Sequence, residues 1–309
     1  AGSAGVLSDW ILRGARNRDF RQLTVHLDSL GVQRSCSPDV NFLRFSAAML
    51  GKNLLSVLPV YADILQRPHL PDNGFEPARD LSLQQLDAIE DEPSHKLSIA
   101  LRERHYPFPY GRPTTLTSVG AISPADVRAF YDAYYRPNNT LVAVVGDITP
   151  EQAKAKLTRA FGGWQARPVK APPVPALKPL AGRKVVLVDR DVSQSFIMLG
   201  HPGVKRNNPD YFPLLVLNVI LGGDFTSRLN MSIRDNQGLA YGAGSNFTMY
   251  RDAGYFSANL NTRTATTAKA LDSLLAEIRG IQSGQVTADE LQTAKAYLTG
   301  SFPLRFETN

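Results

Sequence analysis

A proline-rich segment near the middle of the chain limits the folds that this sequence can adopt. Residues 169–180 read VKAPPVPALKPL, which places four prolines among twelve residues. Because proline lacks a backbone N–H and fixes φ, this segment is unsuited to a helix or a central strand and favours an extended spacer. A chain of 309 residues is long enough for about two domains. We therefore predict a first domain at residues 1–168, a linker at 169–180 and a second domain at 181–309.

Composition and charge exclude several classes of protein. Hydrophobic residues make up 43% and charged residues 20% of the chain, as in globular proteins. We predict no membrane span, because no apolar run approaches about 18 residues, and the first residues lack the pattern of a signal peptide. The net charge of +6 is spread over short clusters such as Lys205-Arg206, so we predict no nucleic-acid binding. The single cysteine, Cys36, excludes a disulfide within the chain and leaves the redox compartment open.

Helix-start patterns and apolar runs predict a mixture of helices and strands. Ser123-Pro124 is typical of an N-cap followed by proline at the first helical position, and capping-box patterns begin at Thr149 and Thr287. Apolar spacing predicts further helices at residues 5–13, 19–30, 54–66, 75–92, 95–104, 208–221 and 266–281. Apolar runs predict strands at residues 40–50, 136–148, 184–189, 195–199, 241–249 and 254–262. The fold class predicted from this mixture is α+β.

The stretch from Leu221 to Asn246 carries the candidate functional residues. A Gly222-Gly223 turn precedes a predicted helical run in which Phe225, Leu229 and Ile233 recur at four-residue spacing. Arg234 lies near the end of that helix and Tyr241 at the start of the next predicted strand. A guanidinium can hold a peptide carbonyl or carboxylate, and a phenol can donate to an oxyanion. The alternative is an arginine that caps its own helix beside a half-buried tyrosine.

Several motifs together resemble the pitrilysin/insulinase family of zinc metallopeptidases, which includes the mitochondrial processing peptidase. They are RGARNRDFRQLTVHLDSLG (13–31), EDEP (90–93), YGRPT (110–114), YYRPNNTLVAVVGDI (134–148), LGHPG (199–203), LGGDFTSRL (221–229) and GLAYGAGS (238–245). The resemblance implies two homologous α+β domains, each an antiparallel sheet with helices on one face. It also implies that the first domain is clipped and the second incomplete. Similar pairs of helical segments at residues 54–86 and 270–298 are consistent with a duplication.

The resemblance implies a lost metal site in the first domain. The family's inverted zinc motif, H-x-x-E-H, falls on Gly5, Ser8 and Asp9, and the third ligand, a glutamate in the family, falls on Gln85 beside Gln84. Glycine has no ligand atom, serine is an unsuitable base and glutamine is a weak zinc ligand. No two histidines lie three or four residues apart among His26, His69, His95, His105 and His201. We therefore expect no zinc in this chain and no peptide hydrolysis by the chain alone.

The resemblance implies a role in trans for Arg234 and Tyr241. In the family, a zinc-bearing subunit can pair with a degenerate homologue that supplies these two residues. We expect a peptide or unfolded polypeptide substrate and zinc in the partner subunit. The short LGGDFTSRL, in place of the extended glycine-rich loop of the processing peptidase, favours a bacterial-type heterodimer. The sequence does not identify the compartment, and we expect a soluble protein of the bacterial cytoplasm or periplasm. Two alternatives stay open: a non-enzymatic scaffold or binding protein, like the core subunits of respiratory complexes, and an inert homodimer.

Overall fold

The computed structural model describes residues 1–106, 110–176 and 181–306, which form two compact units. Unit 1 consists of Ala1–Ala88 and Pro113–Pro173, and unit 2 consists of Ile89–Arg112 and the chain from Val174 onward. Residues 89–112 thus interrupt the sequence of unit 1 and fold with unit 2, which a linear division at the proline-rich linker does not anticipate. The last four linker residues, 177–180, lie outside the described residues.

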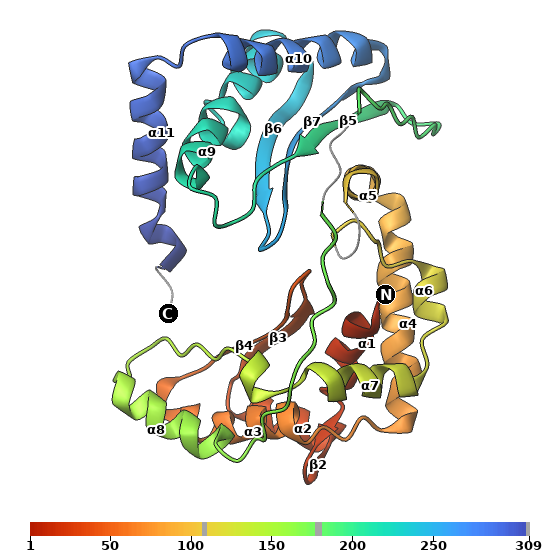
Figure 1. Ribbon diagram of the computed structural model, residues 1–309, viewed down its shortest axis with the longest axis vertical. Coiled ribbons are helices and arrows are strands. Elements are labelled where there is room, and N and C mark those ends of the chain that lie inside the picture. Colours follow the sequence, from red (N-terminus) through yellow and green to blue (C-terminus); the bar gives the residue numbers. More distant parts are fainter. Residues whose placement is uncertain (107–109, 177–180, 307–309) are drawn as a thin grey trace. The chain divides into compact units, whose positions relative to one another are not determined.

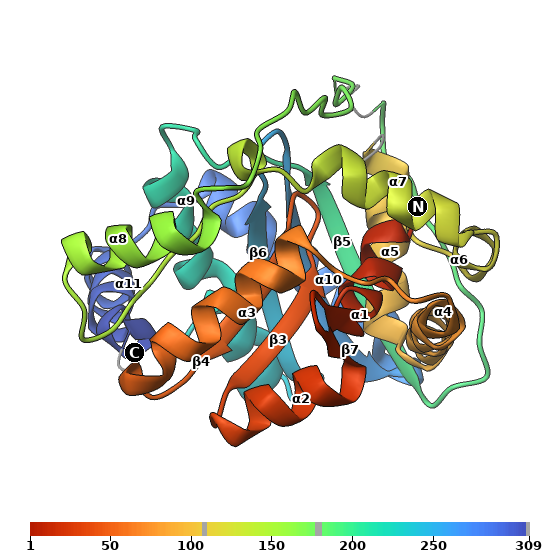
Figure 2. The ribbon, with the colours of Figure 1, turned by 90° about the horizontal axis from the view of Figure 1, so that it is seen from below.

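Unit 1 surrounds one apolar core with helices and two short antiparallel hairpins. Its helices are α1 (Ser3–Trp10), α2 (Phe20–Ser29), α3 (Leu54–Gln66), α4 (Asp72–Ala88), α6 (Leu116–Gly120), α7 (Pro124–Tyr134) and α8 (Pro150–Phe161). Strand β1 (Gly14–Ala15) pairs with β2 (Arg18–Asp19), and β3 (Gln33–Pro38) pairs with β4 (Leu43–Ala48). Figure 2 shows α8 beside α3 in this unit. Trp10 and Phe75 meet edge to face at the centre of the core, with ring centroids 5.1 Å apart.

Unit 2 contains a three-stranded antiparallel sheet in the order β5-β7-β6. The strands are β5 (Gln194–Pro202), β6 (Ala240–Met249) and β7 (Gly254–Arg263), and the helices are α5 (Pro93–His105), α9 (Tyr211–Asn218), α10 (Thr267–Ser283) and α11 (Ala288–Ser301). Figure 1 shows β5 in green, β6 in cyan and β7 in blue among the helices of the unit. The core centres on Leu229, Ile233 and Leu274, whose side chains are fully buried.

Two tyrosines explain why residues 89–112 fold with unit 2. Helix α5 packs against β5, and the Tyr106 hydroxyl, just beyond the helix, donates to the carbonyl of Gly254. The Tyr110 hydroxyl donates to Asp252 Oδ2 at 3.0 Å, and its ring stacks on Tyr250 with centroids 4.9 Å apart. Both contacts anchor the segment to the turn between β6 and β7.

The structure confirms the α+β class with antiparallel sheets, and it confirms the N-cap at Ser123 and the capping boxes at Thr149 and Thr287. Ser123, Thr149 and Thr287 each accept a hydrogen bond from the backbone N–H three residues later, at the starts of α7, α8 and α11. The strands predicted over residues 195–199, 241–249 and 254–262 correspond to β5, β6 and β7. In the described part of the chain, no helix has the length and apolar character needed to cross a membrane.

Two strand predictions are wrong. Residues 136–148 contain a 3₁₀ turn at Pro137–Asn139 and then an extended segment without strand pairing, in which Leu141 is 94% exposed. Residues 184–189 are likewise unpaired, and Leu187 is 87% exposed. Both runs have the apolar composition of buried strands. A strand also needs a neighbour for its backbone N–H and C=O groups, and the described residues supply none to these two segments.

An ion pair joins the LGGDFTSRL stretch to the start of α11. Arg228 donates from Nε to Glu290 Oε1 at 2.6 Å and from Nη2 to Glu290 Oε2 at 2.9 Å. Glu290 also accepts from the backbone N–H of Thr287, completing the capping box. These hydrogen bonds, above all those from Arg228, lower the pKa of the Glu290 carboxyl to about 2.

The low pKa of Glu290 predicts a loss of stability in acid. Because the folded-state pKa lies below the usual value of 4.5, the stabilisation is present above that pH and is lost as the pH falls toward 2. Glu290→Gln should lower the free energy of unfolding at pH 7 by about 1–3 kcal/mol and flatten the decline in acid. Urea unfolding across this pH range measures both effects. The exposed Asp272→Asn on α10 is the control, and a Glu290→Gln curve parallel to that of the wild type would contradict the assignment.

Candidate functional site

The structure brings Arg234 and Tyr241 together on the surface of unit 2. Arg234 Cζ lies 5.5 Å from the centroid of the Tyr241 ring, within the range of a cation–π interaction. The Tyr241 side chain is 87% exposed. A third residue joins them, because Arg234 Cζ also lies 5.6 Å from the centroid of the Phe225 ring. The guanidinium thus has two exposed aromatic neighbours.

Arg234 is held by an irregular helical turn. It lies in η5 (Asn230–Asn236), a π-helical segment, and such widened turns are frequent at functional sites. Just beyond the segment lies Gly238, whose φ of 60° is in the left-handed region and whose N–H donates to the Arg234 carbonyl at 3.0 Å. Leu239 N–H donates to the Ile233 carbonyl at 2.9 Å. This ending turns the chain directly into β6 and fixes the spacing between Arg234 and Tyr241.

A β-bulge directs Tyr241 outward. Strand β6 is at the edge of the sheet, and its pairing with β7 shifts register between Ala240, opposite Thr262, and Ala243, opposite Leu260. Between these two pairs β6 advances by three residues and β7 by two, so β6 contains one extra residue in the segment that includes Tyr241. Bulges at sheet edges commonly re-aim a side chain. The bulge explains how Tyr241 can be exposed two residues before the buried Ala243 on the same strand.

Asn230 connects the parts of the site. Its side chain is buried, and its Nδ2 donates to the Asp224 carbonyl at 3.0 Å. Its Oδ1 accepts from the backbone N–H of Ala243 on β6 at 3.2 Å. Gly222 permits the close approach of the two segments, since a Cβ there would lie 2.5 Å from the Ser245 backbone nitrogen. The turn that carries Phe225 and the strand that carries Tyr241 are thereby fastened to each other.

The guanidinium of Arg234 keeps donors for a ligand. Within the described residues it makes no hydrogen bond, and its one ion pair is a long contact from Nε to Asp235 Oδ1 at 3.8 Å. A guanidinium has five N–H donors in a planar fork that suits carbonyl and carboxylate oxygens. The guanidinium can therefore hold an oxygen acceptor of a ligand beside the Tyr241 ring.

Sequence reasoning missed the roles of Phe225 and Asn230. The four-residue spacing predicts that Phe225 lies on the same buried helical face as Leu229 and Ile233. In the structure Leu229 and Ile233 are fully buried, whereas Phe225 is 73% exposed. The Asp224 carboxylate accepts from Thr226 Oγ1 at 2.6 Å, which makes a turn before the helix starts. An Asp followed two residues later by Thr is a turn signal. Nothing comparable in the sequence marks Asn230.

The positions that correspond to the zinc motif do not fit a metal. Gly5 has no side-chain donor, and the Ser8 hydroxyl donates to the Gly5 carbonyl at 2.6 Å. The Asp9 carboxylate accepts from Arg13 Nε at 2.5 Å, so a cation of the chain itself neutralises it. Gln85 is exposed on α4. Among the residues that the structure describes, no three His, Cys, Asp or Glu side chains gather in a way that could hold a metal ion.

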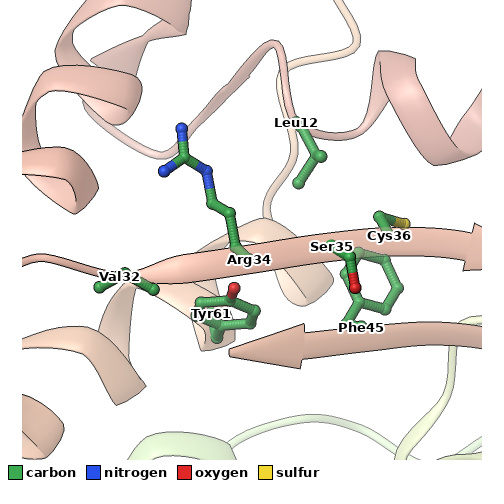
Figure 3. A pocket seen from close by; sticks show the side chains of 7 residues that line it. All are labelled: Leu12, Val32, Arg34, Ser35, Cys36, Phe45 and Tyr61. Atoms are coloured by element: carbon green, nitrogen blue, oxygen red, sulfur yellow. The ribbon is translucent and has the colours of Figure 1, made fainter. Parts of the chain in front are cut away.

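A cavity of about 340 Å³ in unit 1 is the other candidate site. Figure 3 shows its lining side chains along the β3–β4 hairpin, namely Leu12, Val32, Arg34, Ser35, Cys36, Phe45 and Tyr61. Arg34 is paired with Asp28 at 2.6 Å, and the Tyr61 hydroxyl donates to the Ser46 carbonyl at 3.2 Å. Burial, together with the negative charge of Asp9, raises the pKa of the Cys36 thiol to about 12. Arg34 and Tyr61 are thus already paired, and the Cys36 thiol is protonated at neutral pH, so the cavity offers no thiolate nucleophile.

The family model described as the Peptidase M16 inactive domain matches residues 121–298, more than half of the chain. Among curated proteins, an uncharacterised zinc protease of Streptomyces coelicolor is 26% identical over 99% of this chain and 68% of its own length. An uncharacterised zinc protease of Bacillus subtilis is 24% identical over 99% of this chain and 75% of its own length.

Two solved structures share the fold. A peptidase M16 inactive domain from Pseudomonas fluorescens superimposes with a TM-score of 0.87 at 24% identity, covering 97% of this chain and 74% of that chain. A protease from Helicobacter pylori superimposes with a TM-score of 0.89 at 21% identity, covering 100% of this chain and 76% of that chain. At these identities the superpositions establish the fold alone.

The raised pKa of Cys36 predicts an unreactive thiol. Because only the thiolate is nucleophilic, iodoacetamide at pH 8 should alkylate the folded chain at least about a hundredfold more slowly than the unfolded chain. Mass spectrometry with and without guanidinium chloride measures the two rates. Cys36 is the one cysteine in the sequence, so Cys36→Ser is a complete blank. Equal rates for the folded and unfolded chains would contradict the burial of the thiol.

Proposed function

The chain belongs to the pitrilysin/insulinase (M16) family of zinc metallopeptidases, and we propose that it is the non-catalytic subunit of a peptidase heterodimer. In this proposal a homologous subunit carries the zinc ion, and this chain supplies Arg234 and Tyr241 in trans. The substrate is a peptide or an unfolded polypeptide. A bacterial cytoplasm or periplasm is the proposed compartment, and the curated relatives described above are bacterial.

The observation that carries the proposal is the pairing of half-buried Arg234 with exposed Tyr241, with 5.5 Å between the guanidinium carbon and the ring centroid. In the described residues, no hydrogen bond occupies the guanidinium. The pair stands on a π-helical turn and a β-bulge, so two irregular features of the backbone present it to solvent. A purely structural arginine and tyrosine would be expected to bond to the protein itself.

The proposed chemistry assigns one role to each side chain. The Arg234 guanidinium donates to a carbonyl or carboxylate oxygen of the substrate and fixes the position of the backbone. The Tyr241 hydroxyl donates a hydrogen bond to the oxyanion that forms when the scissile carbonyl is attacked. A donor placed for the oxyanion stabilises the transition state more than the ground state, so its effect falls on kcat.

Unit 1 contributes no metal in this proposal. Support comes from the pairing of Asp9 with Arg13 and from the absence of a ligand atom at Gly5. Peptide hydrolysis by the chain alone is therefore not expected, and a zinc-bearing partner supplies the Lewis acid and the activated water when bound.

The proposal predicts a specific loss of turnover in the reconstituted complex. Tyr241→Phe removes one oxyanion donor and should lower kcat by roughly 10²- to 10³-fold, with little change in assembly. The measurement is hydrolysis of fluorescein-labelled casein by the chain co-expressed with a zinc-bearing homologue from the same genome, with assembly followed by size-exclusion chromatography.

Tyr297→Phe on α11 is a matched control, because Tyr297 is also exposed and lies outside the candidate site. Its turnover should equal that of the wild type. Equal turnover for Tyr241→Phe and the wild type would overturn the proposed role, and would leave a non-enzymatic scaffold or binding protein as the function to pursue.

A further inference from the structure

Phe225 is an exposed aromatic residue on a turn that is fixed on both sides. Before it, the Asp224 carbonyl accepts from the backbone N–H of Ser227 at 3.1 Å and from Asn230 Nδ2 at 3.0 Å. After it, Thr226 donates from its backbone N–H and its hydroxyl to the Asp224 carboxylate, at 3.3 and 2.6 Å. The backbone at Phe225 therefore has little freedom to let the ring turn inward.

The exposure of Phe225 is unusual for its residue type. Phenylalanine is among the residues most often buried, yet this ring is 73% exposed. Large aromatic side chains on rigid supports are characteristic anchors of binding surfaces, because they offer much apolar area at a low cost in conformational entropy. The apolar surface of the Phe225 ring lies beside the charged guanidinium of Arg234.

The chemistry of the surface defines the ligand that it suits. Arg234 offers N–H donors for an oxygen acceptor, and the ring of Phe225 offers an apolar contact within the same few ångströms. A peptide presents these two groups together, since each backbone carbonyl lies beside a side chain. A ligand with only the acceptor, such as a polar or glycine-rich peptide, would leave the ring in water.

We propose that Phe225 is a specificity-determining residue that accepts a large apolar side chain of the peptide whose backbone carbonyl or terminal carboxylate binds Arg234. Leucine, methionine and aromatic side chains are the preferred class, because their contact with the ring removes apolar surface from water. The proposal rests on the proposed function in that it uses the same surface. It requires only that the surface binds peptides and makes no claim about hydrolysis.

The first test measures peptide binding by this chain without a partner. The probe is an array of overlapping peptides that covers a casein sequence, incubated with the tagged chain. We expect the wild type to retain peptides rich in leucine, methionine and aromatic residues. Phe225→Ala should weaken binding of these peptides by roughly five- to twentyfold, whereas Phe225→Tyr should keep the preference. Amidated and free C-terminal versions of the bound peptides distinguish a backbone carbonyl from a terminal carboxylate.

Phe212→Ala on α9 is a matched control, because Phe212 is 72% exposed and does not belong to the site. It should bind the array as the wild type does. Thermal unfolding of each variant verifies that it is folded. The proposal is overturned if the wild type binds no peptide, if its preference is not apolar, or if Phe225→Ala keeps that preference.

The second test separates a binding role from a catalytic one in the assembled complex. With fluorogenic peptides that differ only in one leucine or alanine, Phe225→Ala should raise KM for the leucine peptide roughly five- to twentyfold and leave kcat nearly unchanged. A fall in kcat with an unchanged KM would contradict the proposal. If Tyr241→Phe keeps full turnover while Phe225→Ala loses the apolar preference on the array, the proposed function fails and the specificity role of Phe225 stands.

Discussion

The candidate site depends on the side-chain amide of Asn230. The amide donates to the carbonyl of Asp224 and accepts from the N–H of Ala243. Asn230 is also the first residue of the π-helical turn that carries Arg234. A buried amide with both ends paired stabilises a single arrangement, because breaking either hydrogen bond would leave a polar group unsatisfied. These hydrogen bonds join the turn of Phe225, the π-helical turn of Arg234 and the strand of Tyr241. On this joined framework the Phe225 and Tyr241 side chains are exposed and the Arg234 side chain is half-buried.

The two units differ in how the charged side chains at the candidate positions are paired. In unit 1, the Asp9 carboxylate is neutralised by Arg13, four residues later and just beyond α1, and the resulting ion pair needs no ligand. In unit 2, the bidentate pair between Arg228 and Glu290 anchors the same stretch of chain that carries the site, while Arg234 keeps its donors apart from one long contact with Asp235. Unit 1 thus holds a self-contained ion pair at Asp9, and unit 2 holds a cation at Arg234 that keeps donors for an oxygen acceptor.

Local signals in the sequence predicted local structure well. The capping boxes at Thr149 and Thr287 formed as expected, because they involve atoms only three residues apart. Strand predictions at residues 136–148 and 184–189 failed, since apolar composition does not say whether a neighbouring strand is present to pair with. The polar strand Gln33–Pro38 was missed for the opposite reason, because its register with Leu43–Ala48 and not its composition makes it a strand. At the site, spacing and family resemblance selected Arg234 and Tyr241. The two hydrogen bonds of the Asn230 side chain and the exposure of Phe225 could not be predicted, because they depend on contacts between segments that spacing alone does not reveal.

The central claim is that this chain presents Arg234 and Tyr241 to a substrate while another polypeptide holds the zinc ion. The most direct measurement is metal analysis of the native complex, isolated through a tag on this chain and separated into its subunits under conditions that retain bound metal. The account predicts a homologous partner that contains about one zinc ion per subunit and no stoichiometric zinc in this chain. Stoichiometric zinc bound by this chain itself, or a native complex without a zinc-bearing homologue, would contradict it.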